Sequence, residues 1–275
     1  MAESPEIWVA ENQRLQREVK ELRARVAALE TSRWWRLHPR FALAHIAGRL
    51  VRKRDPQPAV TESATPSRTA SSDAADRFRR EVLERGEFTE DWFTVYIPVW
   101  DTVLRELEGK QAKVLELGSF EGMSACFILW RLADAHVTCV DTFAGIPEYD
   151  AYGIGGPALE ERFDRNVALV DAARVRKRVG VTHHVLRDLL DEGERFELAY
   201  VDASHRALDV LADTALCWQL LAPGGICIFD DYGPIPAGVE PLQHPTLAID
   251  AFRRLVAAEL EVVDEQRQLI VRKKS

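Results

Sequence analysis

Cysteine is scarce in this chain of 275 residues, which has four, at positions 126, 139, 217 and 227. None of them has the paired spacing of a zinc site or a redox motif, and all four lie in apolar runs. We therefore expect buried thiols in a reducing cytosol rather than a disulfide framework.

Long apolar runs are missing as well. No run of about 18 apolar residues offers a membrane span. The start, Met-Ala-Glu-Ser-Pro-Glu, has neither the basic nor the apolar part of a secretory signal. These two absences predict a cytoplasmic protein.

Acidic residues are missing from residues 33–54, which contain seven Arg or Lys. Because the whole chain has a formal charge of −8, the remainder carries −15. Phosphate binding needs a basic surface, so this acidic remainder excludes a general nucleic-acid-binding role, and no nucleic-acid partner is expected. With 47% hydrophobic residues, the chain is long enough for one mid-sized core plus appendages.

Residues 1–31 have the spacing of a coiled coil. The seam residues follow each other at intervals of four and three: Trp8, Asn12, Leu15, Val19, Leu22, Val26 and Leu29. Valine at a and leucine at d favour a parallel dimer, in which Asn12 would fix the register. The pattern predicts a homodimer through this segment, with a solitary amphipathic helix as the alternative.

Residues 32–54 combine two tryptophans with a basic amphipathic helix, which is typical of a segment on an anionic membrane surface. Docking on the protein's own acidic body is the alternative. The sequence Trp35-Arg36-Leu37 resembles an element that follows coiled coils in bacterial enzymes of cell-surface polysaccharide assembly. That resemblance implies a glycan acceptor, and the basic composition of the segment predicts peripheral contact with the inner face of the membrane.

Residues 55–75 are rich in Pro, Ser, Thr and Ala, the composition of a flexible linker. In residues 76–275, strands and helices alternate, which is typical of a parallel sheet covered by helices. After a helical lead-in over 76–108, we expect helices from 122, near 158–174, near 187, at 206–220 and at 246–258. The expected strands are 113–117, 136–140, 178–185, 197–201, 225–229, 261–263 and 268–272. Two closing strands of this kind resemble the α/β, Rossmann-like, seven-stranded sheet of methyltransferases.

The stretch from Val114 to Ser124 runs from an apolar strand through two glycines into a helix. Gly118 allows a tight turn, Gly122 lets backbone approach a ligand, and the helix start presents free N–H groups. The spacing is Glu-x-Gly-x-x-x-Gly, whereas dinucleotide binding needs G-x-G-x-x-G.

A tight turn in any α/β protein is one interpretation of this stretch. The pattern also resembles motif I of class I S-adenosylmethionine (SAM) methyltransferases. That resemblance implies that Glu116, Gly118, Ser119 and Gly122 bind the cofactor. Asp141, at the end of the next strand, has the position of a ribose clamp, with a turn cap as the alternative.

Two further buried strands end in carboxylates, Asp202 after one and Asp230 and Asp231 after the other. The carboxyl ends of parallel strands meet at one edge, so we expect these acids to converge beside the glycine loop. Oxygen ligands without cysteine suit Mg²⁺ or a similar hard ion, which would also acidify an acceptor hydroxyl. Loop capping is the alternative.

These strands resemble the metal-dependent O-methyltransferases related to catechol O-methyltransferase, and more closely bacterial enzymes that methylate sugars of antibiotics and surface glycans. The resemblance implies that Asp202, Asp230 and Asp231 hold the metal and that Asp202 has a catalytic role. His205 stands where the catechol enzymes have a general-base lysine. A histidine can take a proton at neutral pH, and bracing the loop is its alternative role.

Other aromatic and histidine residues are assigned by their context. Trp92 and Phe93 form either a lid over the cofactor or part of the core, and the core is favoured. His183 and His184 would alternate faces on a strand, so they cannot both face one site. Acceptor recognition is expected in the loops 143–157 and 232–245.

The sequence thus predicts a SAM-dependent O-methyltransferase, assisted by a divalent metal, that acts on a hydroxyl of a sugar or surface-glycan precursor. A nucleotide-dependent oxidoreductase or epimerase on the same sheet is one alternative. A non-catalytic scaffold of a glycan-assembly complex is another.

Overall fold

A computed structural model of the chain describes residues 68–145, 157–235, 238–266 and 268–274. The predicted coiled coil, the basic segment and residues 55–67 of the predicted linker lie outside these ranges. Helix α3 (Arg68–Glu81) covers the rest of that linker. Within the described ranges, no helix has both the length and the apolar character needed to cross a bilayer.

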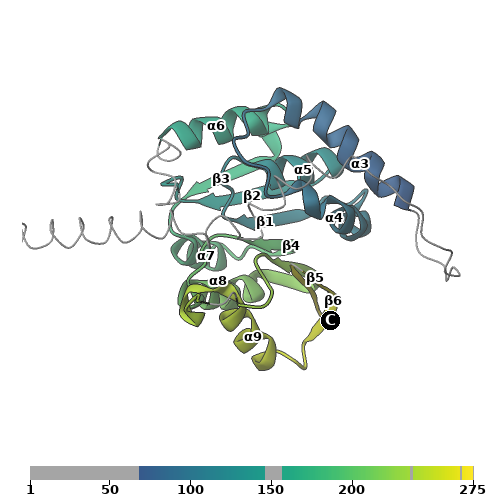
Figure 1. Cartoon of the computed structure of the whole chain (residues 1–275). Coiled ribbons are helices and arrows are strands. Elements are labelled where there is room, and N and C mark those ends of the chain that lie inside the picture. The colour runs from purple at the N-terminus through teal and green to yellow at the C-terminus, as the bar shows by residue number, and fades with distance from the viewer. Residues whose placement is uncertain (1–67, 146–156, 236–237, 267, 275) are drawn as a thin grey trace, which may run out of the picture. The chain divides into compact units, whose positions relative to one another are not determined.

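A mixed sheet of seven strands forms the centre of the described part of the chain, in the order β3-β2-β1-β4-β5-β7-β6 (Figure 1). The first five pair in parallel, and β7 runs antiparallel to both of its neighbours. The strands are β1 (Lys113–Leu117), β2 (His136–Asp141), β3 (Val175–Val179), β4 (Phe196–Val201), β5 (Leu221–Phe229), β6 (Leu260–Glu265) and β7 (Leu269–Lys273). This topology confirms the predicted Rossmann-like α/β sheet.

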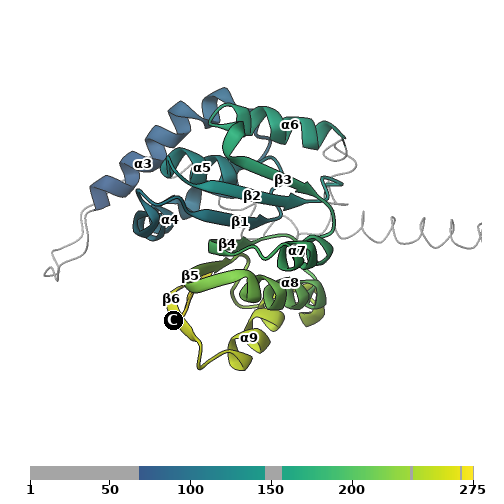
Figure 2. The ribbon, with the colours of Figure 1, turned by 180° about the vertical axis from the view of Figure 1, so that it is seen from behind.

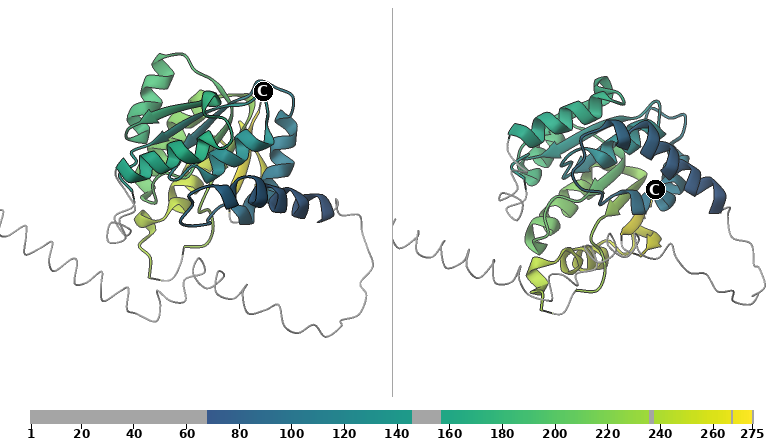
Figure 3. Two further views of the ribbon diagram at one scale, coloured as in Figure 1. Left: turned by 90° about the horizontal axis from the view of Figure 1, so that it is seen from above. Right: turned by 45° about the horizontal axis from the view of Figure 1, so that its top comes forward.

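Helices cover both faces of the sheet (Figures 1 and 2). One layer holds α3, α4 (Ile97–Leu104), α5 (Met123–Arg131) and α6 (Pro157–Ala168). The other holds α7 (Thr182–Asp191), α8 (Ala207–Leu220) and α9 (Pro245–Leu255), and the views in Figure 3 show the sheet between the two layers. Each layer buries its own apolar cluster against the sheet, which fixes the ends of the strands in space.

The predicted strand over 178–185 is wrong. The structure has β3 over Val175–Val179, and residues 182–191 form helix α7. Gly180, with φ +158°, follows the strand, and Val185, Leu186 and Leu189 are buried at the spacing of one helix face. His183 and His184 therefore lie on a helix, with their ring centroids 4.4 Å apart.

Strand β3 forms one edge of the sheet and carries three consecutive cations, each paired with acids. Arg176 and Arg178 both contact Glu192 at 2.7 Å, and Lys177 lies 2.7 Å from Asp164. Charged side chains of this kind discourage another chain from pairing with an open edge.

All four cysteines are free and buried, which confirms the expectation of buried thiols. Burial raises the pKa of the Cys126 and Cys139 thiols, so both are neutral at physiological pH. They belong to the packing of the core.

Candidate active site

The glycine loop between β1 and α5 lies directly against the end of β4. Gly118 and Gly122 have φ of +84° and +81°, a backbone conformation that favours glycine. A Cβ on Gly118 would lie 2.0 Å from the Asp202 carbonyl oxygen, and one on Gly122 would lie 2.9 Å from the Phe163 ring. Gly118 therefore allows two loops of the predicted site to touch, and Gly122 allows α6 to pack behind them.

Two buried polar residues, one at the end of β1 and one in this loop, have atoms without a hydrogen-bond partner among the described residues. Glu116 is fully buried; its Oε1 accepts a 2.6 Å hydrogen bond from the Ser124 hydroxyl, and its Oε2 is unpartnered. Ser119 is 3% exposed, and its hydroxyl is also unpartnered. Burial raises the pKa of Glu116. Buried polar atoms normally have partners, so this spot suits a polar ligand group.

Asp141 ties the glycine loop to the end of β2. Its Oδ2 accepts the Phe120 backbone N–H at 2.8 Å, and its Oδ1 accepts that of Phe143 at 2.7 Å. Both phenylalanines have positive φ, 46° and 51°. The capping role that the sequence left open is thus present. Each carboxylate oxygen has a second lone pair, so a ligand hydroxyl can still bind.

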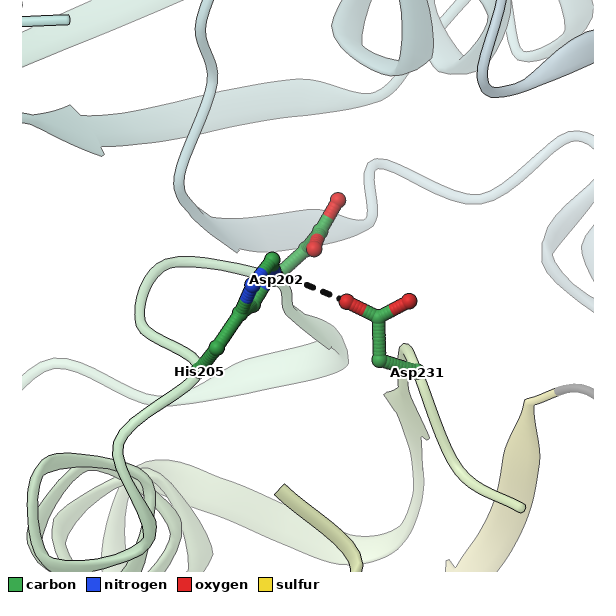
Figure 4. Close-up of side chains that lie close together, drawn as sticks. All are labelled: Asp202, His205 and Asp231. Atoms are coloured by element: carbon green, nitrogen blue, oxygen red, sulfur yellow. Dashed lines mark ion pairs between the residues drawn. The ribbon is translucent and has the colours of Figure 1, made fainter. Parts of the chain in front are cut away.

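Asp202, His205 and Asp231 converge from the loops after β4 and β5 (Figure 4). Each offers one ligand atom, and these three atoms lie within 4.8 Å of one another. His205 Nε2 lies 2.9 Å from Asp231 Oδ2, and the histidine side chain is 52% exposed. Asp231 has φ +54°, a strained conformation for a residue other than glycine.

Asp230 is more deeply buried than Asp231, and its carboxylate accepts hydrogen bonds from groups inside the fold. Its Oδ2 accepts a 2.6 Å hydrogen bond from the Tyr200 hydroxyl, and its Oδ1 accepts the Asp231 backbone N–H at 2.8 Å. The Tyr200 oxygen also lies 3.0 Å from Asp202. Burial, with both carboxylates beside it, raises the pKa of Tyr200 well above its usual value, so the hydroxyl keeps its proton.

Glu121 anchors the glycine loop to the lead-in segment, which sequence reasoning missed. It is 2% exposed and accepts hydrogen bonds from the Thr89 N–H at 2.6 Å and hydroxyl at 2.7 Å. It also pairs with Arg162 of α6. Asn166, fully buried, donates to the Glu121 carbonyl oxygen. An acid between two glycines of an otherwise apolar stretch was the available signal.

The two aromatic residues of the lead-in have different environments. Phe93 is 5% exposed and packs in the core, as favoured from the sequence. Trp92 is half-buried, and its ring centroid lies 5.3 Å from that of Phe120 in the glycine loop. Trp92 therefore lies beside the predicted cofactor loop.

A sequence profile described as a methyltransferase domain matches residues 115–232. The matched range runs from β1 to the loop after β5 and contains both loops of the site. The match covers 118 of the 275 residues, in the central part of the chain. No curated protein sequence matches the chain significantly.

Solved methyltransferases have a similar fold. A putative O-methyltransferase from Klebsiella pneumoniae is 18% identical with a TM-score of 0.52, over 74% of this chain and 90% of that one. The O-methyltransferase TomG from Streptomyces achromogenes, which is involved in tomaymycin synthesis and was solved with SAM, is 16% identical. Its TM-score is 0.52, over 84% and 95% of the two chains.

The methyltransferase MycE of the mycinamycin pathway, solved with Mg and S-adenosylhomocysteine (SAH), is 18% identical with a TM-score of 0.50. The alignment covers 74% of this chain and 55% of MycE, so the chain matches about half the length of that protein. At these identities, the similarity shows a shared fold.

Proposed function

We propose that this protein is a SAM-dependent O-methyltransferase assisted by a divalent metal. The observation that carries the proposal is the contact between two loops. Gly118 of the glycine loop packs against the backbone of Asp202, which belongs with Asp230 and Asp231 to the acid cluster after β4 and β5. A donor bound at the glycine loop and an acceptor held at the acid cluster would then be neighbours, which is the arrangement that direct transfer needs.

The residues of the glycine loop suit SAM. Glu116 and Ser119 offer buried polar atoms that a ligand could satisfy, and Asp141 offers lone pairs for ribose hydroxyls. When bound, SAM supplies an electrophilic methyl group. SAM and SAH in the structures of TomG and MycE support this choice of cofactor. The glycine spacing speaks against the alternative of a nucleotide-dependent oxidoreductase or epimerase.

The acid cluster suits a hard divalent ion. Asp202 and Asp231 offer carboxylate oxygens that lie within 4.8 Å of each other and of a His205 ring nitrogen. Asp230 offers a third carboxylate beside them, and all four cysteines are buried within the core. When bound, such an ion would lower the pKa of an acceptor hydroxyl and hold it in place. The Mg in the MycE structure supports magnesium.

His205 is the residue that would take the proton of the acceptor. It is half-exposed at the mouth of the cluster, and its contact with Asp231 would stabilise the imidazolium formed on protonation. The same contact also braces the loop after β4 against the loop after β5. The role as a base and the role as a brace both use the contact between His205 and Asp231. His205→Gln retains a hydrogen bond but removes the basic nitrogen, so this variant separates the two roles.

We infer that the acceptor is a hydroxyl of a sugar or surface-glycan precursor. The support is the resemblance of residues 32–40 to an element of surface-polysaccharide enzymes, together with the basic charge of residues 32–54. That charge suits contact with an anionic membrane surface, and the heptads of residues 1–31 suit a homodimer.

Calorimetric titration of the purified protein with SAM and with NAD, each with and without Mg²⁺, tests the cofactor. We expect SAM to bind and NAD not to bind. Binding of NAD without binding of SAM would favour the oxidoreductase alternative. If neither SAM nor NAD binds, the non-catalytic scaffold becomes the favoured hypothesis. Formation of SAH with a panel of nucleotide sugars, compared with a panel of phenols, then tests the acceptor class.

A pair of variants tests the metal. Asp231→Asn removes a charge from the cluster, and Asp171→Asn, at the start of a surface turn before β3, is the matched control. We expect the first to lose Mg²⁺-stimulated SAH formation and to keep SAM affinity, and the second to change neither. Undiminished methyl transfer by Asp231→Asn would refute the metal role.

A further inference from the structure

Tyr200 places one hydroxyl between the two acidic strand ends of the site. It is the penultimate residue of β4, it is 3% exposed, and its hydroxyl oxygen lies 2.6 Å from Asp230 and 3.0 Å from Asp202. These acids follow neighbouring parallel strands, β4 and β5. A single donor thus connects the carboxylates that the two strands contribute.

The ring of Tyr200 is held from behind. Trp100 of α4 meets it edge-on, with ring centroids 4.8 Å apart and an angle of 89°. Trp100 is fully buried, and its indole N–H donates a 2.8 Å hydrogen bond to Gln268 Oε1. Because the ring is fixed by packing and the hydroxyl sits at its tip, the position of the hydroxyl oxygen is fixed as well.

The hydrogen bond between Tyr200 and Asp230 continues to Asp231. Asp230 uses one oxygen for the Tyr200 hydroxyl and the other for the backbone N–H of Asp231. Asp231 has a positive φ, and such a conformation persists only when the surroundings hold it. Hydrogen bonds therefore link the Asp231 backbone, whose carboxylate contacts His205, to Tyr200 through Asp230.

We propose that Tyr200 is a positioning residue, whose hydroxyl holds Asp202 directly, and Asp231 through Asp230, in place for a divalent ion. This inference rests on the proposed metal-assisted function and adds to it a residue that does not itself bind the ion. Two carboxylates packed beside each other repel, and a shared proton donor offsets that repulsion while no cation is bound. A phenylalanine at position 200 would keep the packing against Trp100 and remove the donor.

Binding of Mn²⁺ alone, followed by the electron paramagnetic resonance signal of the free ion, tests the proposal on the full chain. Tyr200→Phe is compared with Thr102→Val, which loses a surface hydroxyl of α4 that donates to the Pro98 carbonyl oxygen. Partners of metal ligands typically affect metal affinity by about 10–100-fold. We expect a loss of this size for Tyr200→Phe, no loss for Thr102→Val, and unchanged SAM affinity for both.

The outcomes separate the inference from the function on which it rests. Wild-type affinity for Mn²⁺ in Tyr200→Phe would overturn the role of Tyr200 and leave the metal site intact. Absence of Mn²⁺ binding by the wild-type protein would overturn both. Parallel loss of Mn²⁺ and SAM affinity would make Tyr200 a residue of the fold alone, which also overturns the proposal.

A second variant covers the case in which Tyr200→Phe does not fold. Trp100→Phe keeps the hydroxyl but removes the indole hydrogen bond that fixes the ring. We expect it to weaken Mn²⁺ binding with SAM affinity retained. Full Mn²⁺ affinity in this variant would contradict the dependence of the site on a fixed tyrosine ring.

Discussion

Asp213 should make the fold less stable at neutral pH than an uncharged residue in its place. This residue of α8 is 1% exposed, and burial raises the pKa of its carboxyl to about 6 from an ordinary value of 3.8. Its hydrogen bonds come from one hydroxyl, that of Thr182 at the start of α7, at 2.7 Å from each oxygen. One neutral donor does not compensate for burying the charge.

The sign follows from proton linkage. Between pH 3.8 and about 6 the folded state binds more protons at Asp213 than the unfolded state, so its contribution to stability falls as pH rises through this window. A pKa shift of about two units corresponds to roughly 3 kcal/mol in the free energy of unfolding. This contribution is fully lost once the pH exceeds the pKa of the folded state. Asp213→Asn keeps an acceptor for Thr182 and removes the charge.

Urea unfolding of both proteins, followed by tryptophan fluorescence at pH values from 4 to 8, measures the effect. We expect nearly equal free energies of unfolding at pH 4 and an advantage for Asp213→Asn that grows to about 3 kcal/mol above pH 7. Thr182→Val should shift stability in the opposite direction at neutral pH, because it removes the one donor. A constant difference between Asp213→Asn and wild type across this range would refute the reasoning.

Three further substitutions test the glycine loop. Gly118→Ala should destabilise the fold by about 3 kcal/mol or more in urea unfolding, because it combines a positive φ with overlap against the Asp202 carbonyl oxygen. Glu121→Ala should cost about 3–5 kcal/mol by the same assay, since it leaves the Arg162 guanidinium without its buried partner. Asp141→Asn should weaken SAM binding in calorimetry, because an amide group opposes one of the two backbone N–H groups. Unchanged SAM affinity would exclude a role for Asp141 in binding SAM.

The central strands could be predicted from the sequence, because their apolar runs are buried on both faces of the sheet. The prediction failed at β3, whose sequence Val-Arg-Lys-Arg-Val has little apolar signal, since an edge strand pairs on one side and exposes its cations. The predicted strand over 178–185 includes His183 and Val185, although the buried residues after Gly180 follow the spacing of a helix.

The site was predictable where the chemistry follows a strand end. Asp202, Asp231 and His205 come together because parallel strands share an edge, which the alternation of elements already indicates. Tyr200 and Glu121 were not predictable in the same way. Asp230 lies 30 residues from Tyr200 and Thr89 lies 32 residues from Glu121, so these contacts depend on side-chain packing that no local pattern encodes.

The paired cations of β3 have a consequence for how the protein behaves in concentrated solution. The exposed pairs at this edge are weak and are screened as ionic strength rises. A high salt concentration would therefore weaken the charge barrier that keeps this edge from pairing with that of a second molecule, so edge-to-edge aggregation in salt should begin at β3.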